Sequence, residues 1–311
     1  KNTLRRELEW IRRGCQARST KQQARIDRFE DMKEASREAR AKFDKSLMDM
    51  SSVSRRLGKK TIELNNITKA YDGHTYINDF SYIFLRDDRI GIIGSNGCGK
   101  STLINLIPRL YDATQGSVLV DGHDVKNITM EDLRSEIGYV PQKGVLFSGT
   151  IASNLRYGKD DATDAQIEEA ASIAQATEFI DSKSAKYDSP IAQGDTNVSG
   201  GQKQRLSIAR AIAKDPKIYI FDDSFSALDF KTDTQLRKAL KPKTKDATVF
   251  IVAQRVSTIL HADQILVLDE GKLVGKGTHK ELVKTCETYM QIAKSQLSEA
   301  EFAASIEGKE D

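Results

Sequence analysis

Short apolar runs bounded by turn residues recur from residue 61 onward, and each has the length of a β-strand. Segments with helical spacing of apolar residues lie between several of these runs. Strands that alternate with helices, and that are apolar at nearly every position, are typical of a parallel sheet covered on both faces. The sequence therefore predicts an α/β fold with a parallel sheet core. The predicted strands are residues 61–64, 76–85, 89–93, 117–120, 137–140, 217–221, 248–252 and 264–268.

Residues 1–52 show helical spacing instead. Residues 12–21 interrupt that spacing and predict a turn between two helices, and the Ser-, Lys- and Arg-rich residues 51–60 predict a linker. We therefore expect a helical extension over residues 1–58, a main domain over 59–295, and a frayed helix end over 296–311. The apolar positions that define the helical spacing are Leu4, Leu8, Ile11, Ile26, Phe29 and Met32.

Charge is unevenly distributed along the 311 residues, although the formal net charge is only +3. Residues 1–58 hold 16 Lys and Arg against 9 Asp and Glu, so the basic excess lies in the helical extension. The three cysteines, Cys15, Cys98 and Cys286, are odd in number and widely spaced, which favours a reducing compartment. No apolar run reaches the length of a membrane span, and no signal-peptide core is present. We expect a cytoplasmic location, with peripheral attachment to the cytoplasmic face of a membrane as the alternative. Because the sequence does not begin with Met, we expect a piece of a longer chain.

Residues 94–101 read GSNGCGKS, which matches the phosphate-loop pattern G-x-x-x-x-G-K-[ST]. A predicted strand precedes the loop and a helical pattern follows it, as the motif requires. Backbone amides of such a loop surround phosphate oxygens, Lys100 is expected to meet the β- and γ-phosphates, and Ser101 to ligate Mg²⁺. The sequence thus predicts a binding site for ATP and Mg²⁺. Its expected nucleotide contacts are Ser95, Asn96, Gly97, Cys98, Gly99, Lys100, Ser101 and Thr102.

Cys98 lies inside this loop, where backbone amides lower thiol pKa values, so a redox-sensitive role is one interpretation. A small side chain tolerated by the loop is the favoured one.

Further motifs follow in a fixed order. Residues 199–202 read SGGQ at the start of a helical pattern, and residues 218–223 read IYIFDD, an apolar strand that ends in two carboxylates. Gln142 follows a predicted strand, residues 226–229 read SALD, and Tyr71 lies 23 residues before Gly94. Each element alone carries little information, but the ordered set is specific.

Together these motifs resemble those of the ATP-binding cassette (ABC) ATPases over about residues 60–292. The resemblance implies a P-loop NTPase fold with an antiparallel β portion and a helical signature subdomain over about residues 143–210. It also implies a dimer, because active sites in this family lie between two cassettes. The implied roles are adenine stacking for Tyr71, Mg²⁺ binding for Asp222 and Gln142, and capping of the second cassette's γ-phosphate by Ser199, Gly200, Gly201 and Gln202.

Two positions depart from the family pattern and bear on catalysis. The residue that polarises the attacking water is usually Glu, but here it is Asp223, which is one methylene shorter. The switch residue is usually His, but here it is Gln254, which carries no charge and cannot shuttle a proton. Both departures resemble the degenerate half of heterodimeric ABC exporters. We therefore expect Lys100, Asp223 and Gln254 to act on a bound ATP that is hydrolysed slowly; adequate function of Asp and Gln is the alternative.

The two ends of the chain resemble different subfamilies. Residues 1 to about 105 resemble the soluble, ribosome-associated ABC-F class, and residues from about 108 onward resemble an exporter cassette, as in the GSVLVDG run of residues 116–122. A natural fusion, an assembly artefact and one unusual lineage all remain open.

Three functions follow from these resemblances. The first is an ATPase subunit that drives transport through a membrane partner. The second is a ribosome-associated translation factor that contacts ribosomal RNA through residues 1–58, and the third is a recombined nucleotide-binding chain without a partner.

Overall fold

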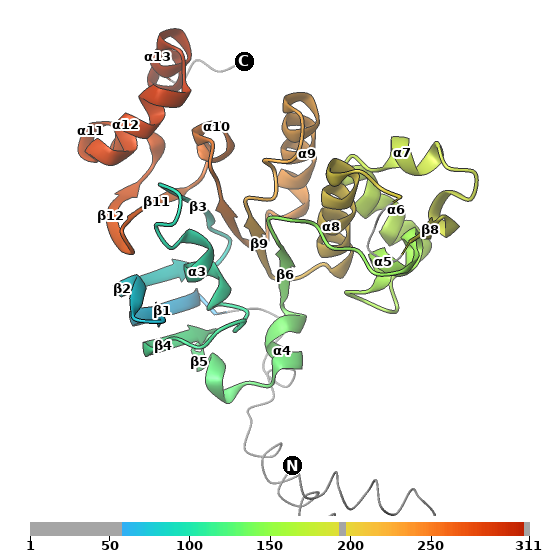
Figure 1. Ribbon diagram of the computed structural model, residues 1–311, viewed down its shortest axis with the longest axis horizontal. Helices are drawn as coiled ribbons and strands as arrows, with labels where there is room; N and C mark the ends of the chain where they lie inside the picture. The colour runs from blue at the N-terminus through green and yellow to red at the C-terminus, as the bar shows by residue number, and fades with distance from the viewer. Residues whose placement is uncertain (1–57, 193–196, 308–311) are drawn as a thin grey trace, which may run out of the picture.

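The structure is a computed structural model in which residues 58–192 and 197–307 are described. They form a central parallel sheet, an antiparallel sheet beside it, and helices on the outside (Figure 1). The expected α/β fold with a parallel core and an antiparallel portion is confirmed. The expectations for the helical extension fall almost entirely on residues 1–57 and lie outside the described residues.

The central sheet has six strands in the order β12-β11-β3-β10-β9-β6. The strands from β11 to β6 run parallel, and β12 pairs antiparallel with β11 at the edge. Every side chain of β9 and β10 is buried, which explains why these runs are apolar at nearly every position. The strands are β3 (Arg89–Gly94), β6 (Ile137–Val140), β9 (Ile218–Asp222), β10 (Thr248–Val252), β11 (Gln264–Asp269) and β12 (Lys272–Gly277).

The two faces of this sheet belong to two hydrophobic cores. In β9, Tyr219 and Phe221 join the core beneath the helices, whereas Ile218 and Ile220 join the core shared with the antiparallel sheet. This division follows from the two-residue period of a strand. Each core therefore fixes one face of the strands whose ends carry the predicted site.

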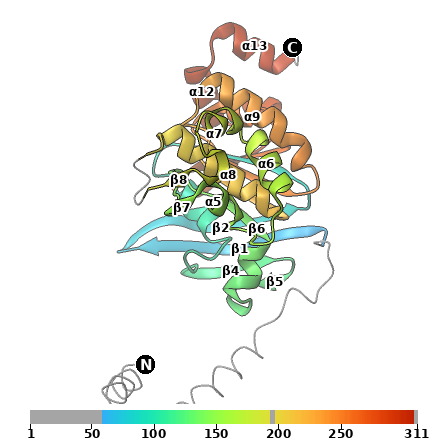
Figure 2. The same ribbon diagram turned by 90° about the vertical axis from the view of Figure 1, so that its right-hand side faces the viewer.

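The antiparallel sheet has the order β2-β1-β4-β5, and a separate two-stranded ribbon pairs β7 with β8. The antiparallel sheet lies at the opposite end of the molecule from the last helix (Figure 2). Strand β1 continues well beyond the predicted residues 61–64. Its later half has a single buried position, Ile67, and no continuous apolar run that would mark a strand in the sequence. The strands are β1 (Lys60–Tyr71), β2 (His74–Leu85), β4 (Gln115–Val120), β5 (His123–Asp124), β7 (Gly149–Thr150) and β8 (Pro190–Ile191).

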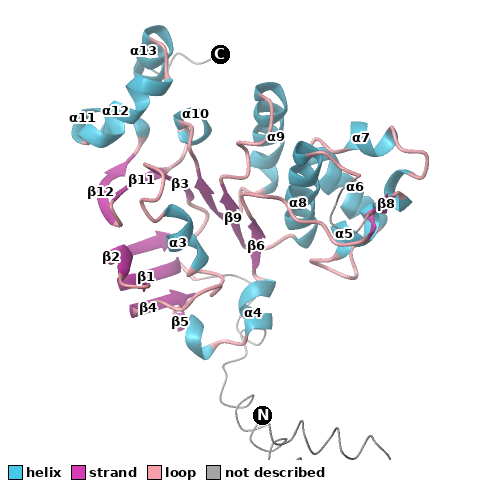
Figure 3. Ribbon diagram, in the orientation of Figure 1, coloured by secondary structure: helices cyan, strands magenta, loops and turns pink. Residues whose placement is uncertain are grey.

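Helices α5 to α8 stand together to one side of the central sheet (Figure 3). They match the expected helical subdomain in place and in length. The helices are α3 (Lys100–Asn105), α4 (Met130–Ser135), α5 (Ile151–Arg156), α6 (Asp164–Ile173), α7 (Thr177–Asp181), α8 (Gly200–Lys214), α9 (Phe230–Lys243), α10 (Val256–Ile259), α11 (His279–Thr285), α12 (Glu287–Gln296) and α13 (Glu299–Glu307), with 3-10 turns η2 (Val125–Asn127) and η3 (Lys186–Asp188).

The end of the chain differs from the frayed helix end expected over residues 296–311. Residues Glu299–Glu307 form helix α13, which packs against α11 and α12. Ser298 and Glu301 bond to each other's backbone N–H groups at the start of this helix. Ser305 is buried and lies 2.9 Å from Nε2 of His279. A cap and a buried partner hold this short helix in place, and the composition of the tail does not reveal either.

Candidate functional site

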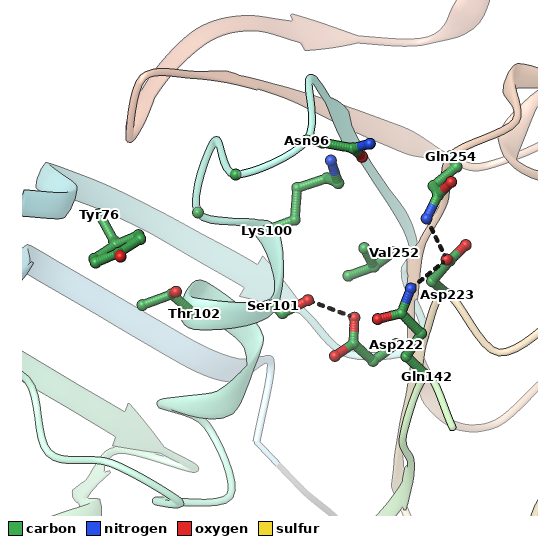
Figure 4. A pocket seen from close by; sticks show the side chains of 12 residues that line it. Tyr76, Asn96, Lys100, Ser101, Thr102, Gln142, Asp222, Asp223, Val252 and Gln254 are labelled. Atoms are coloured by element: carbon green, nitrogen blue, oxygen red, sulfur yellow. Dashed lines mark hydrogen bonds between the residues drawn. The ribbon is translucent and has the colours of Figure 1, made fainter. Parts of the chain in front are cut away.

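A cavity of about 370 Å³ lies where four parallel strands end at their carboxyl edge. The loop after β3, the residue after β6, the end of β9 and the loop after β10 all contribute side chains (Figure 4). This edge is where open α/β sheets bind ligands. The lining residues are Tyr76, Asn96, Gly97, Gly99, Lys100, Ser101, Thr102, Gln142, Asp222, Asp223, Val252 and Gln254.

The phosphate loop between β3 and α3 depends on its glycines. Gly99 precedes α3 with a φ of 99°, and a Cβ there would lie 2.3 Å from the carbonyl oxygen of Tyr76. A Cβ on Gly94 would lie 2.0 Å from the carbonyl oxygen of Leu268. The loop is therefore wedged against β11 on one side and β2 on the other, and only glycine fits at these two contacts.

Lys100 is held by the loop that it follows. Its Nζ donates to the carbonyl oxygens of Gly94 at 2.7 Å and Ser95 at 2.8 Å, and it lies 3.8 Å from Sγ of Cys98. Cys98 itself is 4% exposed and is not among the residues that line the cavity. This burial favours the interpretation of Cys98 as a small packing residue.

Asp222 ends β9 and meets Ser101 across the cavity. The Ser101 hydroxyl donates to Oδ1 of Asp222 at 2.9 Å. Burial raises the pKa of the Asp222 carboxyl, and the nearby Asp223 adds to the shift, while hydrogen bonds from Ser101 and Tyr139 and the charge of Lys100 oppose it. The protein alone thus leaves the ionised carboxylate incompletely compensated.

Asp223 is held by two side-chain amides. Nε2 of Gln254 donates to Oδ2 of Asp223 at 2.6 Å, and Nε2 of Gln142 donates to the same oxygen at 3.0 Å (Figure 4). The backbone of Asp223 has a φ of 47°, a left-handed conformation that Asp tolerates better than most residues. The three residues follow β9, β10 and β6, which are neighbours in the sheet. Their side chains therefore form one hydrogen-bonded cluster at the cavity wall.

The donor set of this cavity fits a hard divalent cation. Mg²⁺ prefers carboxylate, hydroxyl and carbonyl oxygens, and the Ser101 hydroxyl, the Asp222 carboxylate and the Gln142 amide oxygen supply these types. A cation beside Asp222 would also compensate the carboxylate whose pKa is raised by burial. These residues are the ones that sequence reasoning selected for the metal.

Several predicted contacts lie outside the cavity lining. Ser95 and Cys98 belong to the phosphate loop but do not line the cavity. Tyr71 does not line it either, and instead packs edge-on against Tyr76 with ring centroids 5.6 Å apart. The signature residues 199–202 also do not line it, and they begin α8 in the helical subdomain.

The N-terminus of α8 is capped within the chain. The Ser199 hydroxyl accepts from the backbone N–H of Gln202, and the Gln202 side chain accepts from that of Ser199, which is a capping box. Gly200 and Gly201 have ordinary backbone angles, and a Cβ on either would meet no atom closer than 3.6 Å. The fold of one chain therefore does not require glycine at these two positions.

Sequence reasoning did not select Tyr76, Val252 or Gln204. Tyr76 and Val252 line the cavity, and no motif singles them out. Gln204 is 1% exposed; it accepts from the backbone N–H of Gly144 at 2.8 Å and donates to the carbonyl oxygen of Pro141 at 3.1 Å. The sequence does contain a signal for Gln204, because it is a polar residue on the otherwise apolar face of the helix predicted after residue 199.

Known proteins resemble this chain over most of its described length. Residues 77–226 match the ABC transporter family. An uncharacterized ABC transporter ATP-binding protein of Mycobacterium tuberculosis is 46% identical over 240 residues, which cover 76% of this chain and 41% of that protein. The β-(1→2)glucan export ATP-binding/permease protein NdvA of Rhodopseudomonas palustris is 44% identical over 245 residues, which cover 78% of this chain and 41% of that protein.

A solved structure of a bacterial Atm1-family ABC exporter with ATP bound superposes with a TM-score of 0.76 at 34% identity. The match covers 82% of this chain and 45% of the exporter chain. The chain thus spans less than half the length of the proteins that it matches here.

Proposed function

The chain carries an ABC transporter ATP-binding domain, and from that premise we propose that it is the ATP-hydrolysing unit of an exporter. The observation that carries the proposal is the convergence of Lys100, Ser101 and the two carboxylates Asp222 and Asp223 in one cavity. In this proposal the phosphate-loop amides and Lys100 bind the phosphates of ATP. Ser101, Asp222 and Gln142 hold Mg²⁺, which when bound neutralises phosphate charge.

We place the adenine of ATP near Tyr76 and Tyr71. Tyr76 lines the cavity, and Tyr71 contacts both Tyr76 and Tyr111 through edge-on ring packing at 5.6 and 5.5 Å. Aromatic faces at the edge of a phosphate site bind a purine without selecting it by hydrogen bonds. This arrangement supports adenine stacking by the tyrosine cluster as a whole, with Tyr71 behind or beside the contacting ring.

The signature residues support a dimer as the functional unit. Gly200 and Gly201 occupy the first turn of α8, where glycine costs about 1 kcal/mol relative to alanine, although the fold of one chain does not require it. Glycine at such a place keeps backbone N–H groups open to an approaching group. We propose that this group is the γ-phosphate of ATP bound to a second cassette.

Hydrolysis is proposed to be slow. The Asp223 carboxylate is one methylene shorter than the usual Glu. A base withdrawn by about 1 Å can lose on the order of 100-fold in rate. Gln254 donates a hydrogen bond but cannot carry the charge or the proton that a His would carry. These features support the expectation that this chain resembles the degenerate half of a heterodimeric exporter.

An exposed aromatic groove supports docking onto a membrane-embedded partner. Phe147 stacks on Tyr157 with ring centroids 4.3 Å apart, the two side chains are 42% and 62% exposed, and Arg210 lies 5.2 Å from the Phe147 ring. They line a cavity of about 350 Å³ together with Leu110. No helix among the described residues is long and apolar enough to cross a membrane. We propose that a cytoplasmic segment of a permease domain occupies the groove, which would place the chain at the cytoplasmic membrane face.

A second candidate function concerns residues 1–58. Their excess of Lys and Arg, with Trp10 among them, is the composition expected of a segment that binds ribosomal RNA through phosphate contacts. Retention of ribosomal RNA on a filter at low salt, and its loss at high salt, would support an ABC-F-like role. Absence of retention at low salt would exclude it.

The experiment that tests the main proposal is the ATPase rate as a function of protein concentration. A dimeric active site predicts that the specific rate rises with concentration and then saturates. The Lys100→Ala variant serves as the control for contaminating ATPases, since Lys100 is the expected phosphate ligand. A Mg²⁺-dependent rate that is independent of concentration in a monomeric protein would contradict the dimer. No ATP binding at all would contradict the function.

A further inference from the structure

The loop after β10 carries Gln254, and a residue some forty positions later holds the backbone of that loop. Gln296, the last residue of α12, donates from Nε2 to the carbonyl oxygen of Gln254 at 2.8 Å. Its Oε1 accepts from the backbone N–H of Val256 at 2.8 Å. One side-chain amide thus bonds to the backbone on both sides of Arg255.

The sequence of the loop explains why this support is needed. Helix α10 begins at Val256, and its preceding residue, Arg255, offers no side-chain acceptor to the helix N-terminus. The first N–H groups of a helix lack intrahelical partners. The Gln296 amide supplies an acceptor for one of them and a donor for the adjacent carbonyl. The planar side-chain amide of Gln carries both groups at its end.

Helix α12 is a firm platform for this contact. Tyr289 and Ala293 on α12 are fully buried in the same hydrophobic core as Val256 and Ile259 of α10. The Tyr289 hydroxyl lies 2.8 Å from Nδ1 of the buried His279 on α11. Helix α12 and helix α10, which follows the loop, therefore belong to one packed unit.

The support continues into the cavity. Gln254, whose carbonyl Gln296 holds, donates from its side chain to Oδ2 of Asp223 at 2.6 Å. The direction of that amide depends on the backbone that Gln296 fixes. We propose that Gln296 is a positioning residue that aims the Gln254 side chain at Asp223 and at the γ-phosphate of bound ATP. This inference rests on the proposed ATPase function and adds the C-terminal helices to its machinery.

The test compares Gln296→Ala with Gln291→Ala, which removes an exposed amide from the same helix. Gln296→Ala is expected to lower kcat about tenfold and to raise the KM for ATP by a smaller factor, because it misdirects a side chain at the γ-phosphate. The ratio of ADP to ATP dissociation constants, measured with fluorescent nucleotides and Mg²⁺, is expected to fall toward one. Gln291→Ala is expected to change neither quantity.

Two further variants test whether Gln296 acts through the loop that carries Gln254. Gln296→Glu retains the acceptor for Val256 and loses the donor to Gln254, so it tests the loop if Gln296→Ala folds poorly. Gln254→Ala combined with Gln296→Ala is expected to match Gln254→Ala alone, because Gln296 acts through Gln254. Additive losses would overturn the proposal, as would Gln296→Ala and Gln296→Glu that both behave like Gln291→Ala.

The nucleotide ratio separates the failure of this inference from the failure of the proposed function. If the unaltered chain binds ATP and does not hydrolyse it, the ADP-to-ATP ratio still decides the role of Gln296. If the unaltered chain does not bind ATP, the proposed function fails, and this inference fails with it.

Discussion

The two adjacent carboxylates of the cavity have different neighbours. Asp222 accepts from the Ser101 hydroxyl, which belongs to the phosphate-loop helix, whereas Asp223 accepts from the amides of Gln142 and Gln254. In our proposal the first arrangement orients a carboxylate toward Mg²⁺. The second holds the shorter Asp223 carboxylate in place, so the short reach of Asp223 and the missing charge of Gln254 limit the rate of hydrolysis in our proposal.

Replacing both limiting residues is therefore expected to accelerate hydrolysis. Asp223→Glu extends the carboxylate by about 1 Å, and Gln254→His introduces a hydrogen-bonding group that can also carry charge, so kcat should rise at least about tenfold. Steady-state ATPase assays of the double variant measure this, with Lys100→Ala added as the inactive control. The absence of any gain in the double variant would refute slow hydrolysis by this cause.

Two glycines of the phosphate loop are expected to differ in how much stability the protein loses when each is replaced by alanine. Both have left-handed φ values, 82° at Gly97 and 99° at Gly99, but only Gly99 has a neighbour, Tyr76 O, within van der Waals contact of a Cβ. Gly97→Ala should lower the free energy of unfolding by about 1 kcal/mol through backbone strain alone. Gly99→Ala should lower it by about 3 kcal/mol or more, because the clash is with backbone. Urea titrations of both variants measure the difference, and equal losses would contradict the close approach.

The sequence predicts most residues of the site but not which of their side chains contact one another. Gln142, Asp223 and Gln254 were selected as separate motif positions, and nothing in the sequence indicates that both amides bind one oxygen. That convergence depends on β6, β9 and β10 being neighbours, which long-range strand pairing decides. Tyr76 escaped notice for the same reason, since β2 brings it to the cavity from the other sheet.

At the scale of elements, helix α8 does more than carry the signature residues. The buried Gln204 on α8 ties the segment after β6 through Gly144 and Pro141. A Cβ on Gly144 would lie 2.8 Å from the carbonyl oxygen of Lys203, so this segment lies directly against the helix backbone. The segment with Gln142 is thus clamped to the helical subdomain.

Removing the clamp should cost stability, whereas a nearby change should not. Gln204→Leu keeps most of the side-chain volume but leaves two partly buried backbone groups unpaired, which is expected to lower the free energy of unfolding by about 1 to 3 kcal/mol. Ser207→Ala, three residues along α8, removes a buried hydroxyl that has no partner, so its effect should lie between no change and about 1 kcal/mol of stabilisation. Denaturant titrations compare the pair. A Gln204→Leu protein as stable as Ser207→Ala would contradict the clamp.

Elements were predictable where burial dictated their pattern. The strands of the central sheet are apolar because both faces are covered, and all of them except β12 were expected. Strand β12 lies at the edge with alternating exposure, and β5, β7 and β8 are only two residues long, so hydrophobicity does not mark them. Helix α13 depends on His279, a tertiary partner that no local pattern reveals.

In our proposal, one chain holds two halves of a site that do not meet within that chain. The cavity lining includes the phosphate loop and excludes the first turn of α8. The sequence placed both halves through a family resemblance, and the fold of a single chain leaves them apart. Two chains related by a two-fold axis would complete two sites at once.

A mixing experiment tests this arrangement. Lys100→Ala disables the phosphate loop and keeps the signature, and Gly201→Asp disables the signature without a clash inside its own chain, since the nearest atom to a Cβ there is 3.6 Å away. Each variant alone is expected to be inactive. An equal mixture should recover up to about a quarter of the unaltered rate, because half of the dimers carry one intact composite site. Mixtures no more active than the separate variants would contradict a shared site.

The shared oxygen of Asp223 has a consequence that reaches beyond the cavity. Gln142 lies at the start of the segment that leads to the aromatic groove at Phe147, and Gln254 lies in the loop that α12 supports. Both donate to Asp223, so a displacement of the segment or of the loop would change the hydrogen bonds on that carboxylate. Thermodynamic linkage then works in both directions: a partner that shifts the segment changes the affinity for nucleotide, and nucleotide changes the affinity for the partner by the same factor. A carboxylate that is a poor base in this proposal would in this way serve as a junction through which two distant surfaces influence each other.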